Sequence, residues 1–580
     1  MLKFTVIAVL AGACAINLGC VKEHLNEPVS NRPPKTHFWI YPDSNIAEGV
    51  SKQRLHWWGE DEDGYVTAYL FAYVPDLLIL PSPDTLSYAF ITATDTVVQF
   101  PLKQARQTYF VAVRAVDNTF AGIPVNAVVR LSPRPYWDKN GNRSLDAGDV
   151  ELPELSSAVD PNAARQAFPI RNSPPTVAFQ ADPSNPSQVI QQPDTTFTVA
   201  SFSWKGLDPD GDETIASYRV SLNDTSFSSS LTVSSATTLI TLIVPRIVSD
   251  PASSVVSAQV WSGTFPNMRQ LGILTGLKLN GTNVFYLQAR DIAGDLSPRA
   301  QIPQGTKTWF VKKPKSRLLV VSDYQRFDSV DVRKFYKSVV SGVAGGLFAN
   351  YDELDIRVGS TASKPGILVP AILNPAFVHT LKLFDCVLWY TDQFPSLAVA
   401  QFPLYLYVST GGKVIYTTEF ASAVTDPRGT LTDFAPLDSI SSVQLPNPNL
   451  SDASRTWPGT TRIPKNYVLQ ADSSVSSNIY PTLEFDSLNV SNQPTNFHLF
   501  FMRPIYRRAD ARYIYRLQAS DAALQPPGLQ YGGRPTLGII DNAKRFVFMG
   551  VPLHILNGRL NGGQGAQAFI NKVLVGEFGF

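Results

Sequence analysis

The fold is decided by the stretch FSWKGLDPDGD, Phe202–Asp212, because the chain contains nearly the same sequence once before, as LHWWGEDEDG at Leu55–Gly64. Each copy places a tryptophan in an alternating pattern, which predicts a half-buried strand, and follows it with an Asp-rich corner. Each copy also ends on an alternating strand that leads to an aspartate, Asp117 in the first and Asp291 in the second. Two matched landmarks in the same order predict a duplicated domain.

The duplicated pattern, Trp-x-Gly-x-Asp-x-Asp-Gly with a later Ala-x-Asp strand, resembles fibronectin type III and related immunoglobulin-like domains of bacterial surface proteins. The resemblance implies two antiparallel β-sandwiches, at residues 36–132 and 173–313. It further implies that Trp57 or Trp58 lies in the first core and Trp204 in the second.

The composition is that of a folded protein with several domains. Ordinary domain sizes divide a chain of this length into roughly three to five units. The 44 Pro and 36 Gly, with only 17% charged residues, favour many short strands joined by turns. The 49 basic and 48 acidic residues nearly cancel, so the net charge of +1 gives no reason to expect nucleic acid or an anionic membrane surface as a partner.

The amino-terminal segment is expected to be an export signal. Lys3 supplies the positive start of residues 1–19, which are otherwise uncharged and mostly apolar. Cys20 follows, and the arrangement resembles a bacterial lipoprotein signal, which implies a lipid on Cys20 and a tether over residues 20–35. Cys14 is a second candidate, and an ordinary secretory signal or an uncleaved anchor are alternatives. All of these place the body outside the cytoplasm, and a lipoprotein would belong to the cell envelope, at the outer membrane or cell surface.

A different pattern begins after Arg317. Short apolar runs such as Leu318–Val321 alternate with helix-length segments such as Val332–Val343, which predicts a parallel sheet in an α/β layer fold. With only three Cys in the chain, no disulfide framework is expected in any domain.

Three stretches of this region resemble the class I glutamine-amidotransferase-like superfamily, including its trehalose-utilisation-type members. They are DCVLWYTD at 385–392, YVSTGGKVIYTTEF at 407–420 and RFVFMGVPLHIL at 545–556. The resemblance implies a flavodoxin-like three-layer α/β domain over residues 314–580. Residues 431–530 are not explained by it and are interpreted as an elaboration of the domain.

The chemistry of that family needs a Cys on a tight turn between a strand and a helix, joined later by a His and a Glu. Cys386 instead lies inside an apolar strand without neighbouring glycines, where a thiol is normally inert. His554 has a suitable late position, but Leu556 occupies the place of the Glu two residues on. We therefore predict no catalytic residues of this class and interpret the domain as degenerate, which favours a role other than catalysis without deciding whether the protein is an enzyme.

A calcium-type loop lies in residues 133–172, the expected linker between the sandwiches. Its sequence, DKNGNRSLDAGD, spaces oxygen-bearing side chains as EF-hand or dockerin loops do, and calcium is a hard ion that binds such oxygens. Arg143 stands where the turn usually has Gly, and Asp149 where an EF-hand has Glu. The alternative is a solvated polar turn. The predicted structural calcium ligands are Asp138, Asn140, Asn142, Ser144, Asp146 and Asp149.

Two further polar sets are candidates for binding. In the corner of the second sandwich the carboxylates form either a second metal site or a turn in which Asp tolerates tight geometry. At the strand ends of the α/β domain, where open sheets bind ligands, side chains form a predicted ligand rim that either works as acid and base or caps helices and turns. The corner set is Asp208, Asp210 and Asp212, and the rim set is Ser322, Asp323, Asp392 and Glu419.

These features together predict a surface lipoprotein that binds or scaffolds without catalysis, with a polysaccharide or an envelope protein as its partner. The alternative is an extracellular hydrolase that acts on carbohydrate or cell-wall material at the α/β domain. A third possibility is that the α/β domain only stabilises partners in an envelope assembly.

Overall fold

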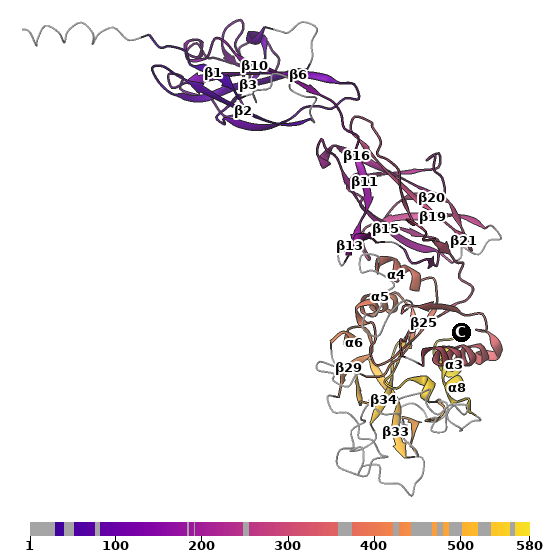
Figure 1. The fold of residues 1–580 in the computed structure, drawn as a ribbon. Coiled ribbons are helices and arrows are strands. Elements are labelled where there is room, and N and C mark those ends of the chain that lie inside the picture. Colours follow the sequence, from indigo (N-terminus) through magenta and orange to yellow (C-terminus); the bar gives the residue numbers. More distant parts are fainter. Residues whose placement is uncertain are drawn as a thin grey trace, which may run out of the picture. The chain divides into compact units, whose positions relative to one another are not determined.

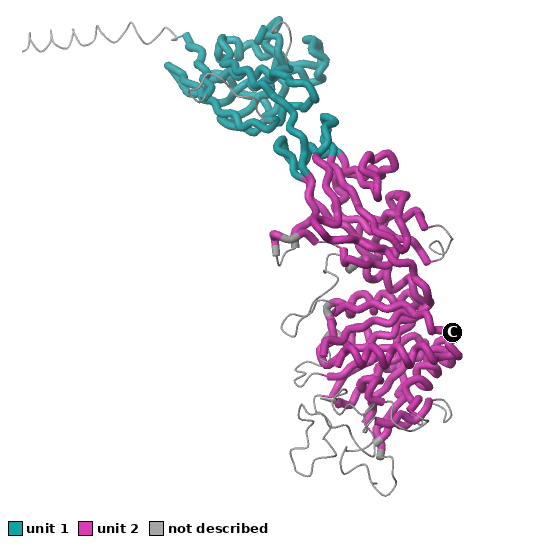
Figure 2. The backbone as a smooth tube through the Cα atoms, turned by 45° about the vertical axis from the view of Figure 1, so that its right-hand side comes forward, with its two compact units in different colours: residues 1–176, 207–216, 290–297 teal, residues 177–206, 217–289, 298–580 magenta. Residues whose placement is uncertain are grey.

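The computed structural model divides the chain into two compact units (Figure 2). Unit 1 comprises residues 1–176, 207–216 and 290–297, and unit 2 comprises residues 177–206, 217–289 and 298–580. The predicted signal and Cys20 lie outside the described residues. The structure describes residues 30–39, 51–75, 82–182, 185–190, 192–246, 254–326, 328–357, 374–420, 429–441, 467–472, 480–485, 502–519, 535–556 and 563–580.

Unit 1 contains the first pair of sheets. Antiparallel pairing builds one sheet of three strands and one of seven (Figure 1). The first has the order β1 (Lys35–Phe38), β2 (Lys52–Glu60) and β5 (Asp95–Gln99). The second has the order β10 (Ala164–Ile170), β6 (Gln107–Asp117), β3 (Val66–Pro75), β4 (Tyr88–Ile91), β7 (Val128–Arg130), β8 (Tyr136–Trp137) and β9 (Val150–Glu151).

Strand alternation selects the core tryptophan of this unit. Successive side chains of a strand point to opposite faces, so only one of two neighbouring tryptophans can enter the core. Trp57 is the buried one and packs against Tyr69 and Phe71, whereas Trp58 is 43% exposed and stacks on His37.

Residues 133–172, expected to be a linker, instead form part of unit 1. Strands β8 and β9 extend the larger sheet, and β10 pairs with β6 over seven residues. A short helix, α2 (Leu155–Ala158), adds Leu155 and Ala158 to the core of this sheet. The calcium-type loop therefore connects two paired strands and has no flanking helices.

The second sandwich uses sheets of five and four strands with two small ones beside them. The five-stranded sheet has the order β11 (Thr176–Phe179), β15 (Val199–Leu207), β18 (Leu239–Ile243), β19 (Val255–Ser262) and β20 (Arg269–Lys278). The four-stranded sheet has the order β17 (Leu231–Ser234), β16 (Ile215–Leu222), β22 (Phe285–Asp291) and β23 (Ala300–Ile302). The small sheets are β14 (Thr195–Thr196), β24 (Phe310–Val311) and β21 (Gly281–Thr282), and the pair β12 (Ala181–Asp182) and β13 (Asn185–Val189).

Aromatic side chains join the two main sheets of this sandwich. Phe202 of β15 stacks on Phe285 of β22 with ring centroids 4.1 Å apart. Trp204 is buried beside them and meets Tyr218 of β16 edge to face, as Trp57 meets Tyr69 in unit 1. An edge-to-face contact between a buried Trp and a Tyr of the next strand thus occurs in both copies of the sequence pattern.

The carboxy-terminal part of unit 2 is built on one nine-stranded mixed sheet (Figure 1). Its first five strands are parallel, and the others continue the sheet antiparallel. The parallel part has the order β26 (Asp352–Asp355), β25 (Leu318–Asp323), β27 (Cys386–Thr391), β28 (Lys413–Thr417) and β35 (Phe546–Met549). The extension has the order β34 (Thr536–Asp541), β33 (Ala511–Ala519), β30 (Tyr467–Ala471) and β31 (Leu483–Glu484), and β29 (Leu437–Ile440) pairs with β32 (Ile505–Arg507) separately.

Helices pack on both faces of this sheet. Alternate residues of β25 enter different cores, Leu318 and Val320 on one side and Leu319 and Val321 on the other. Helices α3 (Ser329–Gly342) and α8 (Gly565–Asn571) cover the first face, and α4 (Asn374–Leu381), α5 (Leu397–Ser409) and α6 (Gly429–Phe434) cover the second. Both faces are buried, which explains why these strands are continuously apolar. The described parts of residues 431–530 supply β30, β31 and β33, which lengthen the main sheet by antiparallel pairing, and the separate pair β29 and β32.

Among the described residues, no helix is both long and apolar enough to span a membrane.

Candidate functional site

The calcium-type loop is held by its own side chains in a chain of tight turns. Asn140 Oδ1 accepts a hydrogen bond from the Asn142 amide at 2.9 Å, and Asn142 Oδ1 accepts one from the Ser144 amide at 2.8 Å. Asp149 accepts hydrogen bonds from the backbone N–H groups of Lys139 and Asp146 at 3.0 and 3.1 Å, which joins the two ends of the loop.

The loop turns at Arg143, although calcium loops usually have Gly at this position. Arg143 has φ of 70°, the left-handed region that usually requires Gly, so the backbone reverses there despite the side chain. Asp146 Oδ2 accepts hydrogen bonds from the side-chain amides of Asn140 and Asn142 at 3.0 and 2.6 Å. Three of the six predicted ligands therefore meet at one point.

Asp138 supplies the buried end of the loop. Its Oδ2 accepts hydrogen bonds from Arg130 Nε at 3.0 Å and from the Arg143 amide at 3.2 Å, whereas its buried Oδ1 has no hydrogen-bond partner in the described part of the chain. In the described ranges, no three His, Cys, Asp or Glu side chains are gathered as a metal centre. The loop fits calcium through a mixed set of oxygens, since calcium also takes Asn and backbone carbonyl oxygens.

The corner of the second sandwich has two buried aspartates and one exposed one. Asp208 and Asp210 are buried and Asp212 is exposed, and all three lie in the segment 207–216 of unit 1. Gly211 has φ of 116°, so the corner needs a residue without Cβ. The turn interpretation accounts for the backbone but not for the burial of two carboxylates.

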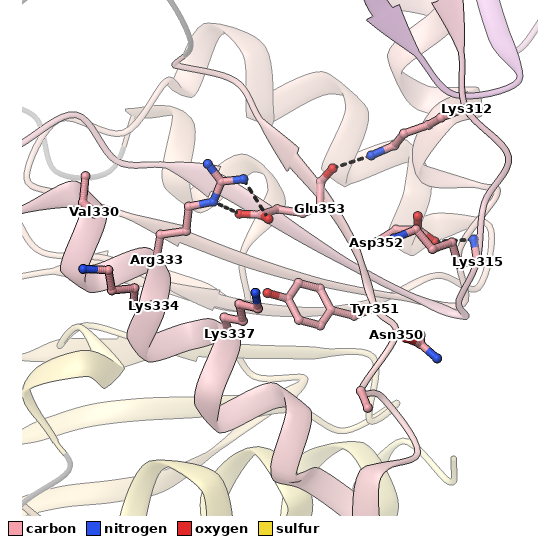
Figure 3. A pocket seen from close by; sticks show the side chains of 11 residues that line it. Lys312, Lys315, Val330, Arg333, Lys334, Lys337, Asn350, Tyr351, Asp352 and Glu353 are labelled. Carbon is pink, nitrogen blue, oxygen red and sulfur yellow. Dashed lines mark hydrogen bonds and ion pairs between the residues drawn. The ribbon is translucent and has the colours of Figure 1, made fainter. Parts of the chain in front are cut away.

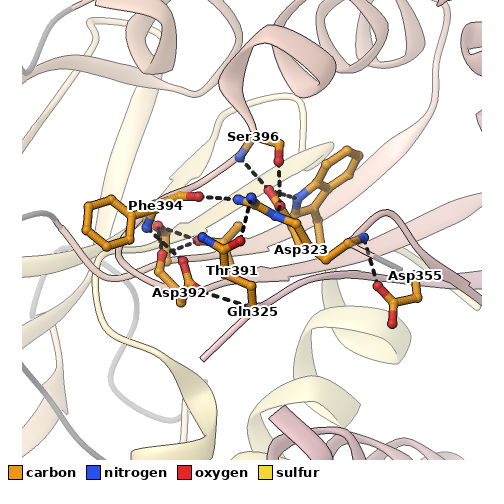
Figure 4. Close-up of polar contacts among 10 residues, drawn as sticks. Asp323, Gln325, Asp355, Thr391, Asp392, Phe394 and Ser396 are labelled. Atoms are coloured by element: carbon orange, nitrogen blue, oxygen red, sulfur yellow. Dashed lines mark hydrogen bonds and ion pairs between the residues drawn. The ribbon is translucent and has the colours of Figure 1, made fainter. Parts of the chain in front are cut away.

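Asp323, Asp392 and Glu419 of the predicted ligand rim are buried at or just beyond the carboxyl ends of β25, β27 and β28, and Figure 4 shows Asp323 and Asp392. Ser322 is also buried, but it precedes Asp323 on β25 and its side chain therefore points to the opposite face of the sheet, so the structure does not bring it together with the other three. Asp323 forms an ion pair with Arg357, with Nε and Oδ1 2.5 Å apart, and accepts hydrogen bonds from the Ser396 amide and hydroxyl at 2.7 and 2.8 Å. Asp392 accepts hydrogen bonds from the amides of Gln325 and Phe394 at 2.9 and 2.8 Å.

The remaining carboxylate of the rim is also paired. Glu419 lies 3.1 Å from Arg326, whose side chain is 8% exposed, and the same arginine lies 3.8 Å from Asp328. Burial raises the pKa of Asp323 to about 6, and Arg357 and Ser396 oppose that rise. Arginines thus pair with two of the buried rim carboxylates, Asp323 and Glu419, whereas Asp392 has only backbone amide donors among the described residues.

Cys386 and His554 do not form a reactive pair. Cys386 begins β27, whereas the rim lies beyond Thr391 at the other end of the strand, roughly 17 Å away at the usual rise per residue. Burial raises the pKa of the Cys386 thiol and lowers the pKa of the His554 imidazole. The rings of Tyr324, Phe335 and Tyr336 surround His554.

A basic cleft of about 590 Å³ opens beside α3 and β26, away from the rim (Figure 3). Arg333 pairs with Glu353 with Nε and Oε1 2.5 Å apart, and Lys312 Nζ donates to the Glu353 carbonyl at 2.8 Å. Burial lowers the pKa of Lys312. The cleft has five cationic side chains against the carboxylates of Asp352 and Glu353. The five are Lys312, Lys315, Arg333, Lys334 and Lys337.

Comparisons with known proteins identify no family. No family model matches the chain, and no curated protein matches it. Among solved structures, a ThuA-like protein of Bacteroides uniformis is similar over 45% of this chain and 90% of its own, at 12% identity and a TM-score of 0.23. Fibronectin(III)-like modules of Clostridium thermocellum CbhA are similar over 48% of this chain and 94% of their own, at 12% identity and a TM-score of 0.14. The FN1–FN3 domains of chicken CNTN1 are similar over 47% of this chain and 68% of their own, at 11% identity and a TM-score of 0.14. These scores are too low for the likenesses to bear on function.

Sequence reasoning missed the arginines of the rim and the basic cleft. Arg357 is 34 residues from Asp323 in the chain, and no local pattern connects them. The basic cleft could have been predicted from the spacing of its cationic residues. Lys312 and Lys315 precede a strand, and Arg333 and Lys337 are four residues apart and so lie on one face of the following helix.

We predict that calcium binds the calcium-type loop and that Asp146→Ala abolishes this binding. The substitution removes the carboxylate on which both Asn side chains converge. Terbium luminescence excited through Trp137, which precedes the loop, should be lower in Asp146→Ala than in the wild type, leaving only the emission from other sites. In the wild type, added calcium should displace the terbium. Glu154→Gln, an exposed change beyond the loop, is the control and should bind normally. Equal terbium emission from Asp146→Ala and wild type would refute the site.

We predict that Arg357→Met destabilises unit 2 by roughly 3–5 kcal/mol at pH 7, because it leaves the buried Asp323 carboxylate without its cation. The folded-state pKa of about 6 exceeds the ordinary value of 3.8, so stability from this group is fully present below about pH 4 and is lost as the pH rises through 6. Without Arg357 this pKa rises further, and the defect should be smaller at pH 5 than at pH 7. Urea unfolding at both pH values measures it.

Arg333→Met serves as the control for that experiment. Its ion pair with Glu353 lies at the surface, where such a pair contributes roughly 1 kcal/mol or less. A defect in Arg357→Met that is no larger than this, or that grows at low pH, would contradict the role given to Asp323.

Proposed function

We propose that this protein is an exported, lipid-anchored protein of the cell envelope that binds or scaffolds without catalysis. Two fibronectin type III or immunoglobulin-like sandwiches would present a flavodoxin-like α/β domain. The order β26-β25-β27-β28-β35, which is 2-1-3-4-5 in chain order, supports the flavodoxin-like class. The observation that carries the proposal is the state of the ligand rim, whose carboxylates are buried against arginines and backbone amides.

The alternative, a hydrolase of carbohydrate or cell-wall material, has less support. A general acid or base has to reach the substrate and exchange a proton with it. Asp323 is 0% exposed and already bonded to Arg357 and Ser396, and Glu419 is 1% exposed and bonded to Arg326. Substrate would have to displace these buried contacts before either group could act.

The proposed ligand is an anionic polysaccharide, and the proposed site is the basic cleft. Lys315 and Lys337 are exposed and form no ion pair in the described part of the chain, although the charge of Lys315 also acts on the nearby Asp352 carboxylate, so both side chains can attract an anion. Asn350 and Tyr351 add hydrogen-bonding groups to the same wall. A volume near 590 Å³ accommodates a ligand larger than one simple ion.

We expect Lys315→Glu combined with Lys337→Glu to weaken binding of polygalacturonate, a uronic acid polymer, by about tenfold or more. Reversing two charges turns attraction into repulsion, and wild-type binding should itself weaken with salt. Calorimetric titration of polygalacturonate and of neutral dextran measures this, with Lys205→Glu on the second sandwich as the matched control. Equal affinity for both polymers would rule out recognition of charge, and loss in the control alone would place the site elsewhere.

We expect lipid to be attached at Cys20. In a bacterial host, labelling with a radioactive or alkyne-bearing fatty acid should mark the wild type, and Cys20→Ala should remove the label and release the protein from membranes. Cys14→Ala should leave the label in place. Persistent labelling of Cys20→Ala would transfer the anchor to Cys14, and an unlabelled, soluble wild type would remove the anchor altogether.

A further inference from the structure

A second cation site is indicated by three buried carboxylates in unit 1 that have no cationic partner. Asp208 is 7% exposed, Asp210 0% and Asp291 1%, and none of them forms an ion pair in the described residues. Asp210 accepts hydrogen bonds from the amides of Ser51 and Ser173 at 2.5 and 2.8 Å. Burying several carboxylates against neutral groups alone is costly, so the cluster lacks a positive charge.

Asn172 connects the cluster to a fourth carboxylate. Its Nδ2 donates to Asp291 Oδ2 at 2.8 Å and to Asp295 Oδ2 at 2.7 Å. Asp291 Oδ1 accepts hydrogen bonds from the amides of Gly294 and Asp295 at 2.7 and 2.9 Å. One side-chain amide therefore lies against two negatively charged groups.

Two buried oxygens of this cluster have no hydrogen-bond partner. They are Asp208 Oδ2 and Asn172 Oδ1, and both side chains are 7% exposed. Asp208 Oδ1 accepts a hydrogen bond from the Asp210 amide at 2.8 Å, and the Ile292 amide donates to the Thr214 carbonyl at 2.8 Å, which joins this corner to the segment of Asp291. A buried carboxylate oxygen without a donor, beside other carboxylates, has the surroundings of a metal ligand.

The same arrangement occurs in the first copy of the repeat. Asn31 Nδ2 donates to Asp117 Oδ2 at 2.7 Å, as Asn172 does to Asp291. Asp63 Oδ2 accepts from the Arg32 amide at 3.0 Å, as Asp210 accepts from Ser173. Asp61 Oδ2 is buried without a partner, as Asp208 Oδ2 is.

This correspondence follows the sequence. An Asn-x-Pro-Pro segment precedes each sandwich, at Asn31–Pro34 and Asn172–Pro175, and each is followed by the Trp strand, the Asp-rich corner and the final Asp. A turn that only needed its own geometry would require none of these distant residues to match. The repeat therefore extends to a set of oxygens drawn from three separate segments.

We propose that Asn172, Asp208 and Asp291 bind a calcium ion, with Asp295 beside them. Calcium suits a site of carboxylate and amide oxygens, and its coordination number of six to eight leaves room for backbone carbonyls and water. The site is separate from the calcium-type loop and uses no residue of it. In the first copy, Asn31, Asp61 and Asp117 occupy the equivalent positions.

Calcium should reverse the effect of Asp208→Asn on thermal stability. Without the ion, replacing one of several crowded carboxylates by a neutral amide relieves repulsion, so the variant should melt at or above the wild-type temperature in a chelator. With millimolar calcium the wild type gains the bound ion, so the variant should melt below it. Equilibrium dialysis should show one calcium fewer per chain. The experiment uses the full mature chain, with Glu213→Gln, an exposed change in the same corner, as the control.

An Asp208→Asn effect that is the same in calcium and in chelator would overturn the proposal. So would an effect that follows pH alone, because the carboxylates would then share a proton instead of an ion. If Asp208→Asn does not fold, the variant Asp146→Ala provides a second measurement. It removes calcium binding at the calcium-type loop and leaves the carboxylate cluster unchanged. Its melting temperature should still rise with calcium, and should do so less when Asp291→Asn is added. A melting temperature of Asp146→Ala that does not respond to calcium would also overturn the proposal.

Discussion

The cost of burying a carboxylate is the constraint on which much of this structure depends. An ionised side chain taken out of water needs an opposite charge or a full set of hydrogen-bond donors. The chain meets this need in two different ways. In the α/β part, Asp323 and Glu419 are neutralised by arginines from other segments, Arg357 and Arg326. In the corner of the second sandwich, Asp208 and its neighbours have neutral hydrogen-bond donors and no ion pair among the described residues, which is the observation behind the proposed cation.

The pairing of Asp323 and Glu419 with arginines also bears on whether the strand ends can bind a ligand. The strand ends of an open α/β sheet are where a ligand usually binds, because the loops there diverge. Here the side chains that would contact a ligand contact one another, with Ser396 and Trp389 completing the shell of Asp323. These strand ends therefore carry carboxylates that already have partners. The basic cleft differs from them because exposed cationic side chains line it, and for that reason we propose it as the binding site.

The parts of the fold set by local pattern could be predicted from the sequence. Alternation located the strands at Trp57 and Trp204, and continuous apolar runs located β25 and β27, because each pattern reflects which faces of a strand are buried. The calcium-type loop is a prediction of the same local kind, since its six predicted ligands lie within twelve consecutive residues. The strands within residues 133–172 could not be predicted in this way, because β8 and β9 have two residues each, too few to give a period.

The candidate sites were predicted only as far as they are local. The corner aspartates can be recognised in the sequence, but Asn172 lies 119 residues from Asp291, and neither segment alone predicts their contact. The repeat makes such a contact predictable by comparison of the two copies. If a contact forms between two segments in one copy, the same two segments of the second copy should form it too, and the pair Asn31 and Asp117 does. Comparing the two copies therefore separates residues that serve the turn, which need only their neighbours, from residues such as Asn172 and Asp291 whose contact joins distant segments and recurs as Asn31 and Asp117.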